Sequence, residues 1–334
     1  MANGKSATMQ DIANRVGVSK ALVSMIFRDV PGPSAETRAR VLAVADELDY
    51  RPNRAAALMT LRRTHMLGVV ANIRNAFHAE MVEHMVAAAD SKGYEVVLGA
   101  VTPTHGESAV IETLLDFRCE AVVILGSESS AQSLRSWSTR VPLIVVGRRV
   151  SGVAVVRATD RRGMSAVVDH LVSLGHSRIA HLSGGSNPIA VDRRDGYTRA
   201  MRRHGLAEFI EVFDGDFTEV SGTDAGLAVR DHPGTRPTAI VAANDRSAVG
   251  LLDALQVAGI VVPEHISVTG YDNSTLAQLG HIALTTVSQE PADQADRAIE
   301  LAVDILDNDR TNLDPVVLVP RLIVRNTTGP APIR

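Results

Sequence analysis

From residue 66 onward, short uninterrupted apolar runs alternate with longer amphipathic segments, and this rhythm limits the possible folds most strongly. We expect strands over 67–73, 95–101, 121–125, 143–146, 179–182, 239–242 and 266–270. Helices are expected over 79–92, 163–174, 189–204 and 247–258. Because the apolar runs are continuous, the strands are buried on both faces, which is typical of parallel sheets in an α/β fold.

The region with this rhythm spans about 260 residues, which favours two parallel-sheet subdomains over one. Ligands of such folds bind beyond the carboxyl ends of the strands. Polar residues follow several expected strands, at 72–78, 147–148, 244–245 and 271–273. The sequence therefore predicts a small-molecule site where these strand ends meet.

The first 50 residues follow a different pattern, that of three short amphipathic helices. Thr8 and Asp11 have the spacing of a capping box, and Gly17 suits the tight turn before a second helix that Ser19 caps. Ser34 caps a third helix, whose inward positions are expected to be Val41, Leu42, Ala45 and Leu48. Two short helices joined by a glycine-containing turn predict a helix-turn-helix, although a three-helix bundle that binds nothing has the same pattern.

Charge and cysteine content narrow the function classes. Residues 1–63 carry 10 Lys and Arg against 6 Asp and Glu, whereas the remainder carries 24 against 32. A basic head on an acidic body is typical of a nucleic-acid-binding module joined to another domain. The single cysteine, Cys119, precedes an apolar run and is expected to be a packed thiol. No secretory signal and no membrane-spanning run are apparent, so we expect a cytoplasmic protein without a membrane partner.

Several motifs together resemble the lactose-repressor/galactose-repressor family. In the head they are Thr8-Met9-Gln10-Asp11-Ile12-Ala13, Gly17-Val18-Ser19, Val23-Ser24 and Pro52-Asn53-Arg54-Ala55-Ala56. In the body they are Asp160, Asp169-His170-Leu171, Gly175-His176 and Arg193-x-x-Gly196-Tyr197. The resemblance, from Thr8 to about Thr328, implies a helix-turn-helix head over 1–50, a hinge helix over 51–63 and a body over 64–330. That body would be similar to type I periplasmic sugar-binding proteins, with two parallel-sheet subdomains. The chain would cross between the subdomains near Asp160 and Ser288.

The resemblance implies that the second helix enters the major groove of DNA. Lys20 and Ala21 would read base edges and Ser24 would contact a phosphate. Leu22, Met25 and Arg28 depart from the Thr, Arg and Asn that are usual in the family. The hinge helix would lie in the minor groove with Met59 as a wedge, unless this segment is a plain linker. The expected DNA-contacting residues are Thr8, Ser19, Lys20, Ala21, Leu22, Ser24, Met25, Arg28, Asn53, Arg54, Leu58 and Met59.

The resemblance also places an effector site in the body. Arg193, Asn244 and Asp272 fall at the family's ligand-contacting positions, and Phe217 falls where an aromatic ring stacks on the effector. Phe77, His78 and Arg148 complete the expected set. A carboxylate, a guanidinium, an amide and a ring suit the hydroxyls and the C–H face of a sugar. The alternative roles are a turn cap for Asp272, a loop brace for Asn244, a surface ion pair for Arg193 and core packing for Phe217.

No enzymatic motif emerges from the sequence. It contains no Gly-x-Ser-x-Gly elbow, phosphate-binding loop or His-Glu-x-x-His pair, and the spacing of His170, His176 and His181 does not suit a metal site. We therefore expect no catalytic activity, cofactor or metal. The prediction is a homodimeric repressor that binds a pseudo-palindromic DNA operator and a carbohydrate effector. Two alternatives are an uptake receptor, which has no use for residues 8–63, and a sugar-modifying enzyme, for which no nucleophile or acid–base pair can be named.

Overall fold

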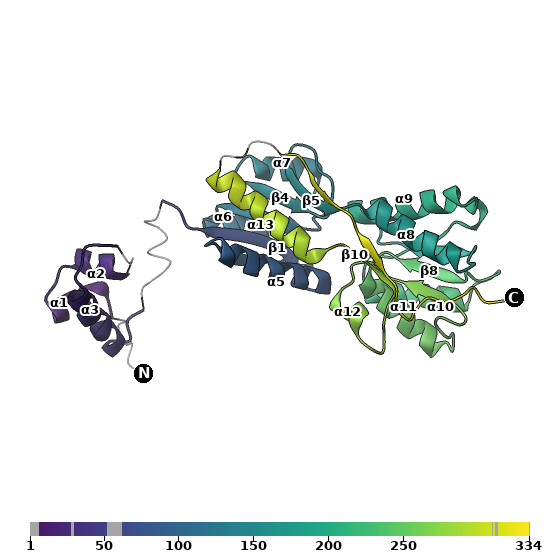
Figure 1. Ribbon diagram of the computed structural model, residues 1–334, viewed down its shortest axis with the longest axis horizontal. Coiled ribbons are helices and arrows are strands. Elements are labelled where there is room, and N and C mark those ends of the chain that lie inside the picture. The colour runs from purple at the N-terminus through teal and green to yellow at the C-terminus, as the bar shows by residue number, and fades with distance from the viewer. Residues whose placement is uncertain (1–6, 28–29, 52–61, 309, 311–312, 334) are drawn as a thin grey trace. The chain divides into compact units, whose positions relative to one another are not determined.

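The computed structural model describes residues 7–27, 30–51, 62–308, 310 and 313–333. The chain divides into two compact units, residues 1–64 and residues 65–334, which we call the head and the body (Figure 1).

The head contains three helices, α1 (Met9–Val16), α2 (Lys20–Phe27) and α3 (Ala35–Glu47). The capping box at the start of α1 is confirmed, because the Thr8 hydroxyl accepts from the Asp11 amide and the Asp11 carboxylate accepts from the Thr8 amide. Gly17 adopts a φ of 80° at the end of α1, which gives the turn its direction. Ser34 caps α3 through the amide of Thr37, as expected.

The three head helices bury one small core. Its members are Ile12, Ala13, Val16, Val23, Ile26, Val41 and Ala45. The Arg40 guanidinium donates to the carbonyl of Val16 at 2.9 Å and so ties α3 to the end of α1. The expectation that Leu42 faces inward is wrong, since its side chain is 42% exposed. Val41 is fully buried in the core, whereas Leu42, about 100° further round the helix, faces outward.

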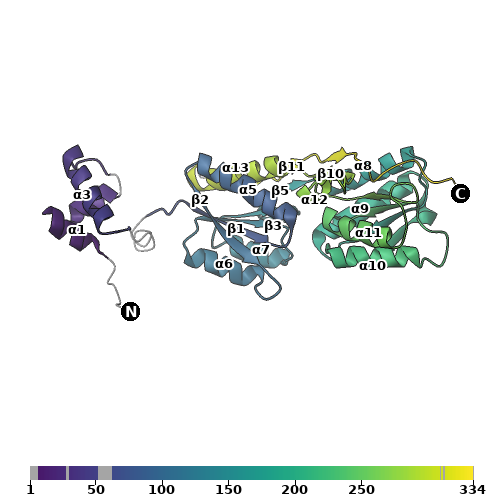
Figure 2. The ribbon, with the colours of Figure 1, turned by 90° about the horizontal axis from the view of Figure 1, so that it is seen from below.

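The first part of the body is built on a six-stranded parallel sheet in the order β11-β5-β4-β3-β1-β2. Its strands are β1 (Met66–Asn72), β2 (Glu95–Val101), β3 (Ala121–Leu125), β4 (Leu143–Val146), β5 (Ala154–Ala158) and β11 (Val316–Leu318). Its helices are α5 (Ala76–Ser91), α6 (Glu107–Asp116), α7 (Ala131–Ser138) and α13 (Pro291–Asp307). Figure 2 shows α5 and α13 on one side of this sheet and α6 and α7 on the other.

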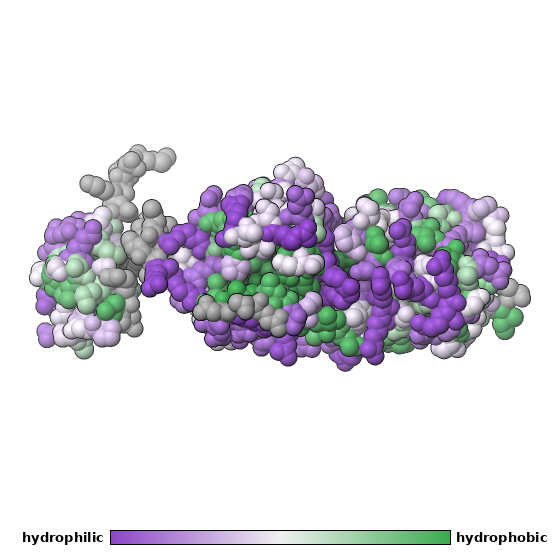
Figure 3. Space-filling view, turned by 90° about the horizontal axis from the view of Figure 1, so that it is seen from above, coloured by the Kyte–Doolittle hydropathy of each residue, from purple (hydrophilic) through white to green (hydrophobic). Residues whose placement is uncertain are grey.

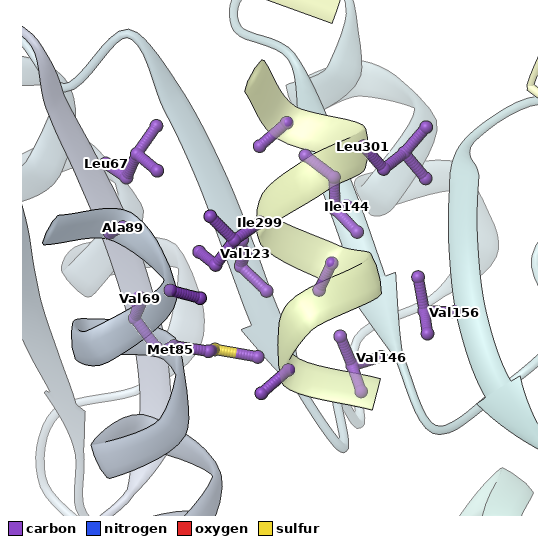
Figure 4. Packing of buried hydrophobic residues seen from close by; sticks show 14 of the residues in the cluster. Leu67, Val69, Met85, Ala89, Val123, Ile144, Val146, Val156, Ile299 and Leu301 are labelled. Carbon is purple, nitrogen blue, oxygen red and sulfur yellow. The ribbon is translucent and has the colours of Figure 1, made fainter. Parts of the chain in front are cut away.

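Branched side chains fill the layer between the first sheet and its α5–α13 face. Val69, Val123 and Ile144 of the strands meet Met85 of α5 and Ile299 of α13, and all five are fully buried (Figure 4). Helices on both faces explain why the strands are apolar without interruption. The segment α13 is as much a part of this core as the strands, although more than a hundred residues separate it from β5.

The second part of the body is built on a four-stranded parallel sheet in the order β7-β6-β8-β9. Its strands are β6 (Ile179–Leu182), β7 (Glu211–Phe213), β8 (Ala239–Ala242) and β9 (Ser267–Thr269). The helical segments are α8 (Asp160–Ser173), α9 (Pro188–Arg203), the 3-10 turn η1 (Ala207–Phe209), α10 (Glu219–Arg230), α11 (Asp245–Val257) and α12 (Thr275–Gln278). Along β8, Ile240 and Val241 enter separate cores on opposite faces, so helices cover both sides.

The chain passes between the two parts of the body three times. It does so between β5 and α8, between β10 (Thr286–Ser288) and α13, and between β11 and β12 (Arg321–Ile323). Strands β10 and β12 pair antiparallel beside the second sheet, and Figure 1 shows them in the narrow region that joins the two parts. On the face seen in Figure 3, apolar residues gather over the part built on the first sheet, with hydrophilic residues around them.

Candidate functional site

The second head helix, α2, presents a face with Lys20 and Ser24 away from the head core. Its first turn is fixed by Ser19, whose hydroxyl accepts from the Leu22 amide at 3.1 Å. Lys20 and Ala21 are exposed, whereas Val23 and Ile26 are buried on the opposite side. The amino end of a helix carries unpaired amide groups and a partial positive charge, which suits a phosphate. A basic side chain beside it strengthens that preference.

The structure describes seven of the twelve residues that we expect to contact DNA. Lys20, Ala21, Ser24 and Met25 fall within an arc of ~140° on α2, at ~100° per residue, and so share one face. Leu22 is only partly exposed and packs against the head core. Thr8 and Ser19 cap α1 and α2. The remaining residues, Arg28, Asn53, Arg54, Leu58 and Met59, lie outside the described residues.

The body contains a cavity of about 140 Å³ where strand ends of both sheets meet. Residues that follow strands of the first sheet form one wall, and residues that follow strands of the second sheet form the other. The lining residues are Asn72, Asn75, Phe77, His78, Met81, Leu125, Gly126, Val146, Gly147, Asn187, Ile189, Arg193, Asp216, Phe217, Thr218, Asn244, Arg246, Asp272, Gln289 and Gln294. This is the location that parallel sheets use for ligands.

Arg193 of α9 lies at the centre of a buried polar cluster and is only 3% exposed. Its Nε donates to the Asp160 carboxylate at 2.9 Å, and its Nη2 lies 3.4 Å from the Asp272 carboxylate. The guanidinium also stacks on Tyr271, 3.9 Å from the ring centroid. Burial lowers the pKa of Arg193, but the Asp160 and Asp272 carboxylates outweigh it and the guanidinium stays charged. Arg193 is therefore a buried organiser of the cavity and not a surface ion-pair residue.

Asp272 follows β9, is 5% exposed, and has a left-handed φ of 118°. Its Oδ1 accepts from Gln289 Nε2 at 2.7 Å, and its backbone amide donates to the Val287 carbonyl. Burial raises the pKa of Asp272 to about 8, although the charge of Arg193 opposes the shift. One arginine faces two buried carboxylates, and Asp160 has the shorter contact with it. Asp272 is consequently the member of the pair that takes up a proton near neutral pH.

Asn244 and Phe217 depend on each other. Asn244 caps α11 through the Ser247 amide, and its Nδ2 donates to the Phe217 carbonyl at 3.1 Å. That bond holds Phe217 at a φ of 68°, in a backbone conformation that is uncommon for a bulky residue. The Phe217 ring lies against Gly184, where any Cβ would collide with it. Asn244 is thus both a loop brace and a cavity residue, and Phe217 lines the cavity instead of the core.

His78 and Phe77 enter the cavity from the first turn of α5. The Asn72 amide donates to His78 Nδ1 at 3.2 Å, so the neutral ring carries its proton on Nε2. Desolvation by the surrounding protein lowers the pKa of His78 to about 4. His78 Nε2 lies against Gly126 on the cavity wall. The ring is therefore a fixed, uncharged hydrogen-bond donor at neutral pH.

Arg148 is the one expected effector residue that does not line this cavity. It is buried, and its Nη1 donates to the carbonyls of Ser127 and Ser129 at 2.9 and 2.8 Å. It follows a strand of the first sheet, as expected, but it braces the neighbouring loop. The sequence reasoning did not single out Arg246, Gln289 and Gln294, which do line the cavity. Arg246 directly follows the Asn244-Asp245 pair and was within reach of the same strand-end argument.

The described residues contain no group of three His, Cys, Asp or Glu side chains that would hold a metal ion. The histidines that the sequence analysis considered have other partners. His176 forms hydrogen bonds with the hydroxyls of Thr238 and Ser267, and His181 Nδ1 contacts the Val241 carbonyl. Cys119 is buried, and burial raises its pKa to about 11, which disfavours the reactive thiolate. No helix among the described residues combines the length and apolar character needed to cross a membrane.

Comparison with known protein families identifies the two units separately. Residues 8–53 match the family described as bacterial regulatory proteins, lacI family. Residues 168–328 match the periplasmic binding protein-like domain. A helix-turn-helix head joined to such a body defines a DNA-binding transcriptional regulator.

Individual relatives match along most of the chain. The ribose operon repressor of Escherichia coli (strain K12) is 32% identical over 90% of this chain and 92% of its own length. A LacI transcriptional regulator from a Rhodococcus species is 41% identical, with a TM-score of 0.77 over 80% of this chain and all of that chain. The lac repressor dimer bound to operator and an anti-inducer is 26% identical, with a TM-score of 0.84 over 97% of this chain and 100% of that chain. The chain therefore belongs to the lacI family of bacterial regulators, whose members found here are transcriptional regulators and not enzymes.

Proposed function

We propose that this protein is a repressor whose affinity for a DNA operator is controlled by a neutral sugar bound in the cavity of the body. The observation that carries the proposal is the set of groups on the cavity wall. Asp272, Arg193 and Asn244 offer fixed polar atoms, and Phe77 and Phe217 offer apolar ring surface. A sugar presents hydroxyls on its edge and C–H groups on its face, so it matches both kinds of surface. The ribose operon repressor among the relatives supports this class of effector.

The charges around the cavity favour an uncharged ligand. Two arginines and two aspartates line it, and both arginines already have carboxylate partners. Arg193 contacts Asp160, and Arg246 lies 2.6 Å from the Glu219 carboxylate. No cation of the wall is left in excess for a phosphate group, whose binding sites are normally rich in Arg and Lys. The cavity volume of about 140 Å³ is below the ~300 Å³ of sites for larger ligands, which favours a monosaccharide.

Coupling between sugar and DNA would arise from the three chain passages that join the two parts of the body. A sugar that contacts Asp272 on one wall and Phe77 on the other favours the closed arrangement of those walls. Only a difference in affinity between two arrangements can change operator binding. We propose that closure acts on the hinge segment over residues 51–63 and thereby on the head. The wedge role of Met59 in the minor groove remains part of this proposal.

For DNA recognition we propose that the exposed face of α2 enters the major groove of each half-site. Lys20 would donate to guanine O6 and N7, Ala21 would contact a thymine methyl group, and Ser24 would contact a phosphate. Met25 lacks the donors of an arginine, so its base contact would be apolar. The protein would act in the cytoplasm, on a pseudo-palindromic operator, as a two-fold symmetric dimer.

We propose that the dimer forms through the surface at the end of α11. Val257 is 83% exposed and Val261 is 48% exposed, and Val261 borders a second cavity of about 490 Å³ in the body. A lac repressor dimer is among the solved structures similar to this chain. Analytical ultracentrifugation tests the surface. Val257→Lys should shift the protein from dimer to monomer, whereas the exposed control Val191→Lys on α9 should not, and equal effects of both would contradict the assignment.

The function is tested by two measurements on the full chain. Selection from a random duplex library should enrich a pseudo-palindromic site, and an unstructured pool would contradict operator recognition. A thermal-shift screen should find stabilisation by a neutral sugar and none by its phosphate ester. A ligand at 100 times its Kd adds ~2.7 kcal/mol to the stability of the protein, which is a shift of several degrees. Asp272→Ala should abolish the sugar shift and leave operator binding by the free protein intact.

A further inference from the structure

Gln294 is a buried polar residue in the first turn of α13, and it lines the cavity with an exposure of only 1%. Its Nε2 donates to the Gln289 carbonyl at 2.7 Å. Its Oε1 has no hydrogen-bond partner within the part of the chain that the structure describes. The Nε2 group therefore has a partner within the protein, whereas the Oε1 acceptor has none.

A buried acceptor without a donor is unfavourable, and folded proteins rarely retain one. An apolar residue of the same size at this position would avoid the loss, as Met81 and Leu125 do elsewhere on the same wall. An unsatisfied acceptor beside a ligand cavity is explained if the ligand brings the missing donor. An amide oxygen accepts and cannot donate, so its partner must be a hydroxyl or an N–H group.

Gln294 is linked to Asp272 through Gln289. The Gln289 carbonyl accepts from Gln294, and the Gln289 side chain donates to Asp272 Oδ1 at 2.7 Å. Gln289 lies on the passage between β10 and α13, where the chain crosses from the second part of the body to the first. The residues next to Gln294, such as Ala295 and Ala298, pack in the core of the first sheet, whereas Asp272 follows a strand of the second. A ligand bound to both Gln294 and Asp272 therefore spans the two parts of the body at their connection.

We propose that Gln294 determines effector specificity by accepting a hydrogen bond from one hydroxyl group of the sugar. This proposal rests on the sugar-binding function proposed above. It assigns a requirement for a donor at one defined position of the effector. A sugar without that hydroxyl would leave the Gln294 oxygen buried and unpaired in the complex as well, and such sites reject the deoxy ligand strongly.

The test compares Gln294→Met with the wild type, because methionine keeps the length of the side chain but removes the acceptor. Gln278→Met in α12 is the matched control. Gln278 also donates through Nε2 to a backbone carbonyl, that of Asn273, but it is exposed and does not line the cavity. Isothermal titration is carried out on the full chain with D-ribose, D-galactose and D-glucose and with their monodeoxy analogues.

For the sugar that binds, Gln294→Met should weaken binding about 10- to 100-fold, and Gln278→Met should leave it unchanged. One monodeoxy analogue should bind weakly to the wild type and equally weakly to Gln294→Met, because the hydroxyl that Gln294 reads is already missing. Equal affinity of wild type and Gln294→Met for the parent sugar would overturn the proposal. So would a uniform loss of affinity for every analogue, which indicates a general change of cavity shape.

Melting of the free protein separates this proposal from the proposed sugar-binding function. Gln294→Met removes the unpaired Oε1, which favours stability, and the hydrogen bond from Nε2 to the Gln289 carbonyl, which opposes it, so the Tm of the free protein should stay within about 4 °C of the wild type if Gln294 is reserved for a ligand. A decrease of more than about 4 °C would identify Gln294 as a structural brace of the passage and overturn the proposal. If no sugar binds the wild type, the carbohydrate assignment fails, and the Tm alone then decides whether Gln294 is reserved for a ligand.

Discussion

Replacing Asp272 by asparagine removes the acid that burial raises to a pKa of about 8, and it keeps the size and the Oδ1 acceptor of the side chain. In the folded protein Asp272 holds its proton up to about pH 8, whereas in the unfolded chain an aspartate loses it near pH 4. Between these values the folded state binds one more proton than the unfolded state. Raising the pH across this window therefore lowers the stability of the wild type, by about 1.4 kcal/mol per pH unit while Asp272 stays protonated.

The interval from pH 7 to pH 8 isolates this effect. Burial also raises the pKa of Asp245, but only to about 6, so its contribution is complete below pH 7. His78 and His181, with pKa values of about 4, are neutral in the folded protein at this pH, whereas in the unfolded chain, where the pKa is ~6.5, they still bind some protons at pH 7. They add a small slope of the opposite sign, which is the same in wild type and Asp272→Asn and cancels in their comparison. As pH approaches the pKa of Asp272 the slope declines, which leaves a loss of about 1 kcal/mol over this interval. For a body of this size that corresponds to roughly 2–4 °C in Tm.

The assay is thermal unfolding followed by the fluorescence of Trp137, which is the only tryptophan of the chain and lies in α7 of the body. The wild type should lose roughly 2–4 °C between pH 7 and pH 8 relative to Asp272→Asn. The exposed aspartate Asp224 of α10 provides the control, and Asp224→Asn should keep the wild-type slope. Parallel pH profiles for wild type and Asp272→Asn would mean that Arg193 keeps Asp272 ionised, and they would refute the argument from burial.

Three further outcomes are expected. Gly222→Ala should destabilise the body by about 1–3 kcal/mol in urea unfolding, because the added Cβ would collide with the Ser247 carbonyl between α10 and α11. The control Gly280→Ala should be neutral, because its Cβ would meet no atom within 4 Å. Lys20→Ala should cost about 1–3 kcal/mol in operator affinity and relax selectivity at one base pair, as measured by fluorescence anisotropy on single-base operator variants; a uniform loss on all variants would indicate a phosphate contact instead. Phe217→Ala should weaken sugar binding at least about tenfold in calorimetry and leave operator affinity of the free protein unchanged, and unaltered sugar affinity would remove the ring from the site.

The buried strands and the capped helices are the features that the sequence predicts most accurately. The expected strands over 95–101, 121–125, 143–146, 179–182 and 239–242 coincide with β2, β3, β4, β6 and β8 at both ends. Of these, β3, β4 and β8 are continuous apolar runs that are buried along their whole length, because helices cover both faces of their sheets. Strand β2 lies at the edge of its sheet and is only partly buried, contrary to the expectation of burial on both faces. The helices of the head could also be predicted, because the caps Thr8 and Ser34 mark the starts of α1 and α3 through local hydrogen bonds. In both cases the signal lies within a few neighbouring residues.

The expected strands left out β5, β7, β10, β11 and β12. Four of them have three residues each, which is too short for a periodic pattern, and β10, β11 and β12 belong to pairs that join segments about 30 or more residues apart. Strand β5 pairs with the nearby β4, but Arg157 interrupts its apolar run. The third chain passage was missed with them. For the same reason Gln289 and Gln294 had no visible strand before them to mark a strand end. Arg148 was expected in the cavity because it follows a strand, but its side chain turns toward a neighbouring loop. The position of a residue at a strand end does not determine the direction of its side chain.

The late position of α13 and β11 has a consequence for how the regulator is made. The second sheet and its helices form one continuous stretch, whereas the first sheet cannot cover its apolar face until α13 has been synthesised and cannot gain its last strand until β11 follows. On the ribosome, domains that are complete at the amino end fold first. A chain that stops after Gln289 would thus contain the complete head. Its first sheet would lack α13 and β11 and would expose apolar residues that α13 normally covers. Under the function proposed above, premature termination near the end of the gene is expected to remove control by the effector and to leave the proposed DNA-contacting surface intact.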